Sequence, residues 1–184
     1  LKDFSSNRIY NSSYTDKLED ILDFDIKKNQ LLVRIESKSD YPNYYFKSLN
    51  GRRINKITDF KNPFDNLNQV DKEVISYKRN DGVELSGVLY LPIGYNKASK
   101  EKMPMILWAY PREFKDKNSA SQNLNNPNEF TNPYYGSMVY WVTKGYVVLD
   151  DASFPIIGED MNEPNDDFRS QLVENARAAI DAVD

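Results

Sequence analysis

The hydrophobic positions of this 184-residue chain follow two different patterns, one before and one after a polar stretch at residues 60–72. In the first part, short runs of branched, aromatic and alternating apolar residues are separated by polar turns, which predicts β-strands. These strands are expected at residues 18–24, 30–36, 44–49 and 53–57. Asn50-Gly51, between the last two, is a strong signal for a hairpin turn.

Four short strands in succession form a β-meander, and one blade of a β-propeller contains four such strands. A single blade cannot bury both of its faces, so neighbouring blades would be expected beside it. A free-standing four-stranded sheet is the alternative interpretation. We expect this blade-like segment to span residues 1–69, with a second region at residues 70–184.

The second region begins with a predicted β-hairpin, whose strands at residues 74–77 and 83–91 flank the turn Asn80-Asp81-Gly82. Continuous apolar runs at residues 105–110 and 146–150 are typical of buried strands. Between them, a polar loop at 112–132 is followed by a short helix at 136–144, which Gly145 would close. Strands that alternate with helices predict an α/β fold with a mostly parallel sheet.

A final amphipathic helix is predicted near the C-terminal end of the sequence, after a polar loop at residues 153–166. Asp166 and Asp167 lie where a cap and a favourable charge for the helix dipole are expected. The apolar positions follow a spacing of three and four residues, which defines the face expected to be buried: Phe168, Leu172, Val173, Ala176, Ala179, Ile180 and Val183.

Composition narrows the chemistry that the chain can perform. It contains no cysteine and no histidine, which excludes disulfides, thiolate sites and any histidine-based catalytic triad within these residues. We expect no metal site and no cofactor. The net charge is -4 and the sequence has no block of basic residues, so the charge pattern does not indicate nucleic-acid binding. No apolar run approaches the roughly 20 residues that span a bilayer.

Several motifs of the second region resemble the prolyl oligopeptidase family of serine peptidases. They are NDGVELSGVLYLP at residues 80–92, ILWAYPRE at 106–113, WVTKGYVVLD at 141–150, SFPIIGE at 153–159, EPND at 163–166 and QLVENARAAIDAV at 171–183. The resemblance implies the N-terminal half of an α/β-hydrolase domain, preceded by the end of a propeller. The EPND loop and the Tyr-Pro-x-Glu strand end are most similar to dipeptidyl-peptidase and glutamyl-endopeptidase-like members.

The resemblance also implies a nucleophile that this sequence lacks. In the family, the serine lies in a G-x-S-x-G turn on the strand after the final helix seen here. None of the seven glycines begins such a motif. We therefore expect a fragment of a serine peptidase that acts on small peptides by acyl-enzyme chemistry and is inactive by itself. An esterase of the same fold and a non-catalytic binding module are the alternatives.

The resemblance assigns a role to Tyr110, because the family places a tyrosine at the end of this strand as a donor to the oxyanion. A tyrosine that simply caps a buried strand is the alternative. Arg112 and Glu113 are candidates to meet a substrate terminus or side chain, or they form a solvated loop pair. Ser153 and Glu159 are candidate substrate-binding residues, or loop and cap groups.

The remaining expectations concern packing, partners and compartment. Trp108 and Trp141 are expected in the core. The last strand, at residues 146–150, is expected to expose an unpaired edge through which the chain would associate with another copy. A peptide is the expected substrate of the intact parent. Peptidases of this kind in bacteria are often exported, which favours a periplasmic or secreted protein, although a cytoplasmic one is also compatible.

Overall fold

The computed structural model describes residues 5–99, 101–121, 125–158, 164 and 166–184. The chain forms two compact units. The first contains residues 1–65 together with residues 128–132, and the second contains residues 66–127 and 133–184. The chain therefore passes between the units three times along its length, and each unit has its own sheet.

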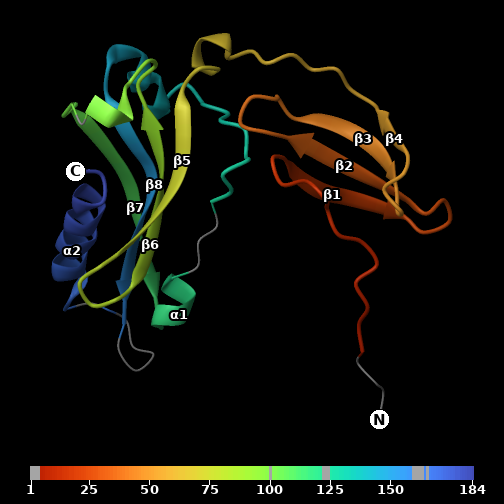
Figure 1. Cartoon of the computed structure of the whole chain (residues 1–184). Helices are drawn as coiled ribbons and strands as arrows, with labels where there is room; N and C mark the ends of the chain where they lie inside the picture. The colour runs from red at the N-terminus through yellow and green to blue at the C-terminus, as the bar shows by residue number, and fades with distance from the viewer. Residues whose placement is uncertain (1–4, 100, 122–124, 159–163, 165) are drawn as a thin grey trace. The chain divides into compact units, whose positions relative to one another are not determined.

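The first unit is an antiparallel meander of four strands in the order β1-β2-β3-β4. The strands are β1 (Leu18–Asp25), β2 (Gln30–Glu36), β3 (Asn43–Ser48) and β4 (Ile54–Lys56), which confirms the four predicted strands (Figure 1). Asn29, at φ 49°, and Gly51, at φ 71°, adopt the left-handed backbone that tight turns require. The turn at Asn50-Gly51 therefore lies where the sequence predicted it.

One face of this meander carries a buried apolar core. Leu31, Val33 and Ile35 of β2 form it, and Tyr10 and Tyr14 from the preceding segment pack against them. The sheet is incompletely covered, since four large apolar side chains of its strands are 41–52% exposed: Ile21, Leu22, Phe46 and Ile54.

A buried ion pair lies at the edge of this core. The Lys47 ammonium is 2.8 Å from a Glu19 carboxylate oxygen, and the two side chains are 6% and 0% exposed. Tyr10 donates its hydroxyl to the same carboxylate at 2.8 Å. The Tyr14 ring centroid lies 4.7 Å from the ammonium, a cation–π contact. The charges thereby hold the N-terminal segment against the sheet.

The second unit contains a mixed sheet of four strands in the order β5-β6-β8-β7. Its strands are β5 (Asp71–Lys78), β6 (Glu84–Leu91), β7 (Met105–Phe114) and β8 (Val147–Ile157). β5 and β6 form the predicted hairpin, with Gly82 at φ 85° in its turn. The pair β7–β8 is parallel, whereas β6 pairs antiparallel with both neighbours, so the expectation of a mostly parallel sheet is wrong for these strands.

Helices cover the two faces of this sheet differently. The helix α2 (Phe168–Asp181) lies along one face (Figure 1), where Leu172, Ala176 and Ala179 pack against β8 and its neighbours. The 3-10 helix η3 (Met138–Lys144) contacts β6 and β8, buries Val139 and Val142, and ends at Gly145, which adopts a left-handed φ of 83°. The remaining short helices are α1 (Lys117–Ala120), η1 (Asp65–Leu67) and η2 (Lys97–Ser99).

Two predicted core assignments differ from the structure. Val173 and Ile180 of α2 are 51% and 49% exposed, whereas Asn175 is fully buried. Trp108 and Trp141 are 48% and 45% exposed, so neither is a core residue here, and Trp141 packs edge-on against Tyr146. Burial of α2 therefore depends on a narrower apolar face than the spacing predicted.

The strands β7 and β8 extend beyond their predicted ends. β7 continues through Pro111 to Phe114, and β8 continues through an irregularity at Asp151, where φ is 46°, to Ile157. The predicted exposed edge at the last strand is also wrong, because β8 lies between β6 and β7. Within the described residues, β5 and β7 are the two outer strands, since the chain crosses back from β7 into the middle of the sheet.

Candidate functional site

Tyr110 lies in the middle of β7 and its side chain is 79% exposed. Its neighbour Ala109 and the β8 residue Ala152 both pack in the core beneath α2. Successive side chains of a strand point to opposite faces, so Tyr110 points to the face away from α2. The structure therefore presents this phenol to solvent on a fixed strand, which is the placement that a hydrogen-bond donor to a ligand requires.

Ser153 of β8 lies beside Tyr110, because the two are register partners in the parallel pair. The Ser153 hydroxyl is 3.3 Å from the hydroxyl of Ser86, on the next strand β6. Ser86 is buried and is the register partner of Ser76 on β5. Hydroxyl-bearing side chains thus follow one another across all four strands, and they can donate or accept hydrogen bonds.

Arg112 and Glu113 lie in β7, not in the loop that the sequence predicted. They pair in register with Pro155 and Ile156 of β8, and both side chains are exposed. Arg112 follows Tyr110 by two residues, about 7 Å along an extended strand. Glu159 is outside the described residues. The structure therefore brings Tyr110, Arg112 and Ser153 into one stretch of two paired strands.

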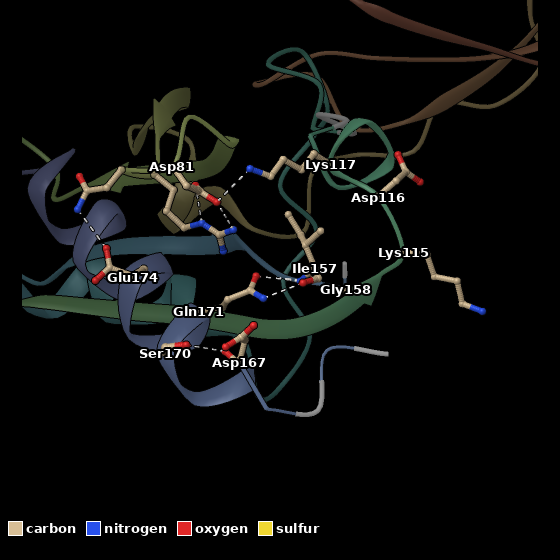
Figure 2. Close-up of a pocket in the computed structure, with 12 residues that line it drawn as sticks. Asp81, Lys115, Asp116, Lys117, Ile157, Gly158, Asp167, Ser170, Gln171 and Glu174 are labelled. Atoms are coloured by element: carbon tan, nitrogen blue, oxygen red, sulfur yellow. Dashed lines mark hydrogen bonds and ion pairs between the residues drawn. The ribbon is translucent and has the colours of Figure 1, made fainter. Parts of the chain in front are cut away.

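A cavity of about 880 Å³ opens elsewhere in the second unit (Figure 2). The β5–β6 turn, the start of α1, the end of β8 and the first turns of α2 surround it. Charged and polar side chains line it, including Asp81, Lys115, Lys117, Gln171 and Glu174. Tyr110 is not among the lining residues, so the cavity and the exposed tyrosine are separate features.

The wall of this cavity is built on a buried arginine. The Arg79 side chain is 4% exposed and forms a two-pronged contact with Asp81, at 2.9 and 2.8 Å. It also donates to the Asn175 side chain at 3.0 Å and to the Pro155 carbonyl at 3.2 Å. The hydrogen bond from Arg79 lowers the pKa of Asp81 to about 2. One guanidinium thereby joins a turn, a strand and a helix.

Two amides on α2 complete this polar network. Gln171 accepts from the Ile157 N–H at 2.9 Å and donates to the Ile157 carbonyl at 2.8 Å, as a neighbouring strand would (Figure 2). Asn175, one helical turn later and fully buried, donates to the Pro155 carbonyl at 2.9 Å. The backbone at the end of β8 is therefore satisfied by side chains of the helix, which fixes the helix against it.

The sequence reasoning missed Arg79, Gln171 and Asn175. A signal for Asn175 was present, because it follows Leu172 by three residues and precedes Ala179 by four, so it lies on the buried helical stripe. A polar residue in such a position needs a hydrogen-bond partner. Nothing in the local pattern around Arg79 indicated that its charge is buried.

Metal binding and membrane spanning bear on the kind of site. Within the described residues, no cluster of three or more histidine, cysteine, aspartate or glutamate side chains is arranged to hold a metal ion. None of the helices in the described residues is long and apolar enough to cross a membrane.

Comparison with known proteins places the chain beside peptidases. No protein-family model matches it. It is 39% identical, over 158 residues, to a probable chloroplastic glutamyl endopeptidase of Oryza sativa subsp. japonica, an alignment that covers 86% of this chain and 17% of the relative. The chain thus spans about a sixth of that protein's length.

Solved structures show the same fold. Oligopeptidase B from Trypanosoma brucei matches 93% of the chain with a TM-score of 0.56 at 11% identity, over 23% of its own length. A post-proline cleaving enzyme from Rickettsia typhi matches 96% with a TM-score of 0.54 at 18% identity, over 24% of its length. The predicted fold class, a blade-like meander followed by a partial α/β-hydrolase sheet with flanking helices, is confirmed. The predicted resemblance to the prolyl oligopeptidase family is also confirmed.

Proposed function

We propose, from this relationship to the prolyl oligopeptidase family of serine peptidases, that the chain acts as part of a peptidase that cleaves peptide bonds through an acyl-enzyme. Residues 1–69 would supply the blade-like end of a propeller and residues 70–184 the first part of the peptidase domain. The observation that carries the proposal is the 39% identity to a probable glutamyl endopeptidase over 158 residues.

Tyr110 has the central chemical role in this proposal. When a serine attacks a peptide carbonyl, negative charge develops on the carbonyl oxygen, and a fixed hydrogen-bond donor stabilises it. The phenol of Tyr110 is exposed and stands on a strand held by β8. The paired hydroxyls of Ser153 and Ser86 lie on the same face, where they support a polar surface beside the phenol.

Arg112 is the proposed partner of an acidic side chain in the substrate. The name of the rice relative indicates cleavage at glutamate, and a guanidinium is the group best suited to bind a carboxylate. Arg112 is exposed, two residues beyond Tyr110 on the same strand. Glu113 and Glu159 are proposed to meet the positive terminus of the peptide, as opposite charges to an amine.

A chimera tests these roles. The segment of the rice relative that aligns with this chain would be replaced by the chain, and hydrolysis of a chromogenic peptide with glutamate at the scissile bond would be measured. Tyr110→Phe is expected to lower kcat by about 10²–10³-fold, the usual effect of removing one oxyanion donor. Tyr135→Phe is the matched control, because Tyr135 is 101% exposed and outside the strands.

Different results with the chimera test the substrate preference, the reaction type and the oxyanion role separately. Arg112→Gln should raise KM for glutamate-containing peptides and leave glutamine-containing ones unchanged. A folded chimera that cleaves esters but no peptides would replace the peptidase by an esterase. A folded chimera in which Tyr110→Phe behaves as Tyr135→Phe would remove the oxyanion role.

The chain by itself is expected to hydrolyse neither peptides nor esters, because its sequence holds no histidine and no G-x-S-x-G motif. Turnover that a serine-directed phosphonate blocks would contradict this expectation. A reading frame that stops after residue 184 would favour a non-catalytic binding module.

Self-association is proposed through β7, which with β5 is one of the two outer strands of the second sheet in the described residues. Outer strands offer unpaired backbone groups to another chain. Pro111, which has no N–H, limits the pairing to part of the strand. Light scattering at increasing concentration should show a dimer or a larger species, and a monomer at all concentrations would contradict this proposal.

We also propose that a bacterial parent is periplasmic or secreted, as the sequence reasoning favoured, whereas the rice relative is described as chloroplastic. Fractionation of cells that produce the full protein tests this directly. Recovery with the cytoplasmic fraction would contradict it.

A further inference from the structure

A short segment from the later part of the chain belongs to the first unit. Residues 128–132 lie between α1 and η3 in the sequence, yet they form part of the unit that contains the meander. Asn128 donates its side-chain amide to the Thr15 carbonyl at 3.1 Å. We call residues 128–132 the clasp.

Phe130 is the apolar anchor of the clasp. Its side chain is 7% exposed. The ring meets Tyr41 edge-on, with centroids 5.2 Å apart at 76°, and lies tilted against Phe64 with centroids 6.5 Å apart. Aromatic pairs of this geometry stabilise the contact beyond the burial of the rings. Phe130 is therefore the buried apolar side chain that holds the clasp.

A buried carboxylate provides the polar contact. Glu36, at the end of β2, is 4% exposed, and it accepts a hydrogen bond from the backbone N–H of Phe130. Its Oε1 atom is 3.3 Å from Arg34 Nη2, but the geometry does not form a hydrogen bond, and this oxygen has no other partner within the described residues. A buried, incompletely satisfied carboxylate is costly in its charged form.

The charges around Glu36 are unbalanced. Arg34 is the positive group that faces it, and this arginine also binds Asp20 at 2.6 Å. Asp20 on β1 and Glu129 on the clasp both add negative charge near Glu36. Docking of the clasp thus brings one further carboxylate toward an already acidic cluster.

We propose that the clasp is a releasable, pH-dependent contact, which docks on the first unit when Glu36 is protonated and is released more readily when Glu36 is charged. With the clasp docked, the second unit is linked to the first at residues 65–66 and also at the two ends of the clasp. With the clasp released, the second unit is continuous with the first through the stretch near residues 65–66 alone. This inference is independent of the proposed peptidase activity.

The direction of the pH dependence follows from burial. Burial raises the pKa of Glu36 and outweighs the other influences: Arg34 and the hydrogen bond from the Phe130 N–H lower this pKa, and the charges of Glu129 and Asp20 raise it further. A carboxyl group whose pKa is higher in the docked state binds its proton more tightly there, so docking is favoured at low pH. The advantage is complete below the ordinary pKa of 4.5 and is lost as the pH rises through the raised value.

Hydrogen exchange of the full 184-residue chain tests the proposal. Protection of the backbone amides at residues 125–132, corrected for intrinsic exchange, would be measured from pH 4 to pH 8. Protection is expected to fall as the pH rises, by about tenfold for each pKa unit that docking adds to Glu36. The amides of β1–β3 serve as the internal reference, because they report whether the whole first unit opens.

Substitutions at two residues, Glu36 and Phe130, make the result specific. Glu36→Gln keeps an acceptor for the Phe130 N–H and removes the charge. In this variant, the protection of the amides at residues 125–132 should be high and independent of pH. Phe130→Ala should abolish protection of the clasp at every pH, and Phe130→Leu, which keeps an apolar side chain, should reduce it less. Tyr135→Ala is the matched control, because this fully exposed aromatic lies just beyond the clasp.

Either of two results would overturn the proposal. One is a pH profile of Glu36→Gln that coincides with the profile of the unmodified chain. The other is protection of residues 125–132 that Phe130→Ala and Phe130→Leu leave unchanged while the amides of β1–β3 remain protected.

Discussion

The two units both contain a four-stranded sheet, but the buried charged side chains of each unit connect different kinds of elements. In the first, strands that follow one another in sequence pair as neighbours, and the buried Lys47–Glu19 pair holds an N-terminal segment against the finished sheet. In the second, the strand order is β5-β6-β8-β7, and the buried Arg79 joins the hairpin turn, the end of β8 and the helix α2.

This difference shows what a buried charge can contribute to a fold. A buried ion pair is weak support for stability in itself, but removal of one partner leaves an uncompensated charge. When the partners of the charge lie close together at one edge of a sheet, the loss of stability is confined to that edge. When the partners lie on three elements far apart in sequence, the loss of stability extends to the whole sheet.

The largest effect is expected for Arg79→Met, which leaves Asp81, Asn175 and the Pro155 carbonyl without their shared donor. The second unit should lose about 3–5 kcal/mol of unfolding free energy. Both tryptophans lie in the second unit, so urea unfolding followed by tryptophan fluorescence measures it. Arg177→Met is the control, since its side chain is 60% exposed, and it should cost less than about 1 kcal/mol.

Lys47→Met is expected to cost about 3 kcal/mol, because it leaves the Glu19 carboxylate buried without its cation. The loss should appear as faster hydrogen exchange in β1, β3 and the segment around Tyr10, while the tryptophan transition of the second unit stays unchanged. Lys28→Met, at a side chain that is 72% exposed, is the control. A shift of the tryptophan transition by Lys47→Met would show that the two units do not differ in this way.

Gln171→Ala should cost the second unit about 1–3 kcal/mol, because it leaves the buried backbone groups of Ile157 without partners. The Ile157 amide should then exchange faster than the amides at the start of β8. Ser170→Ala, next to it on the exposed side of α2, should have little effect. Equal exchange of Ile157 in both variants would mean that α2 does not hold the end of this strand.

The smallest effect is the change in pH dependence that we expect for Asp81→Asn. Arg79 holds the pKa of Asp81 at about 2, below its ordinary value of 3.8, so the folded second unit favours the charged form. This contribution is present above pH 4 and is lost as the pH falls toward 2. Unfolding free energies measured with urea from pH 5 to pH 2 should fall by less in Asp81→Asn than in the unmodified chain. The difference should be about 1 kcal/mol or less.

Prediction from sequence succeeded where the physical cause is local. The turns at Asn50-Gly51 and Asp81-Gly82 and the helix end at Gly145 each depend on a left-handed glycine, which the sequence displays directly. The ends of β7 and β8 were predicted too early, at Pro111 and Asp150, because a proline and a polar residue usually end a strand. Pairing between these two parallel strands, which continues to Phe114 and Ile157, outweighs those local preferences.

The same distinction between local and long-range causes applies to the candidate site. The residue types and spacing around Tyr110 indicated a resemblance to a peptidase, but they did not indicate that Arg112 and Ser153 lie on paired strands rather than in loops. The buried network of Arg79, Gln171 and Asn175 was also absent from the prediction. Its members are 96 residues apart at most, and hydrogen bonds between distant residues leave no periodic pattern in a sequence.

The sequence alone determined which segments are strands and helices, where the main turns lie and which family the chain resembles, because each depends on neighbouring residues and their order. The tertiary structure decided that β8 lies inside the sheet, that Asn175 rather than Val173 faces it, and that residues 128–132 belong to the first unit. These outcomes depend on the burial of polar groups, which requires partners that are brought together only when the chain has folded.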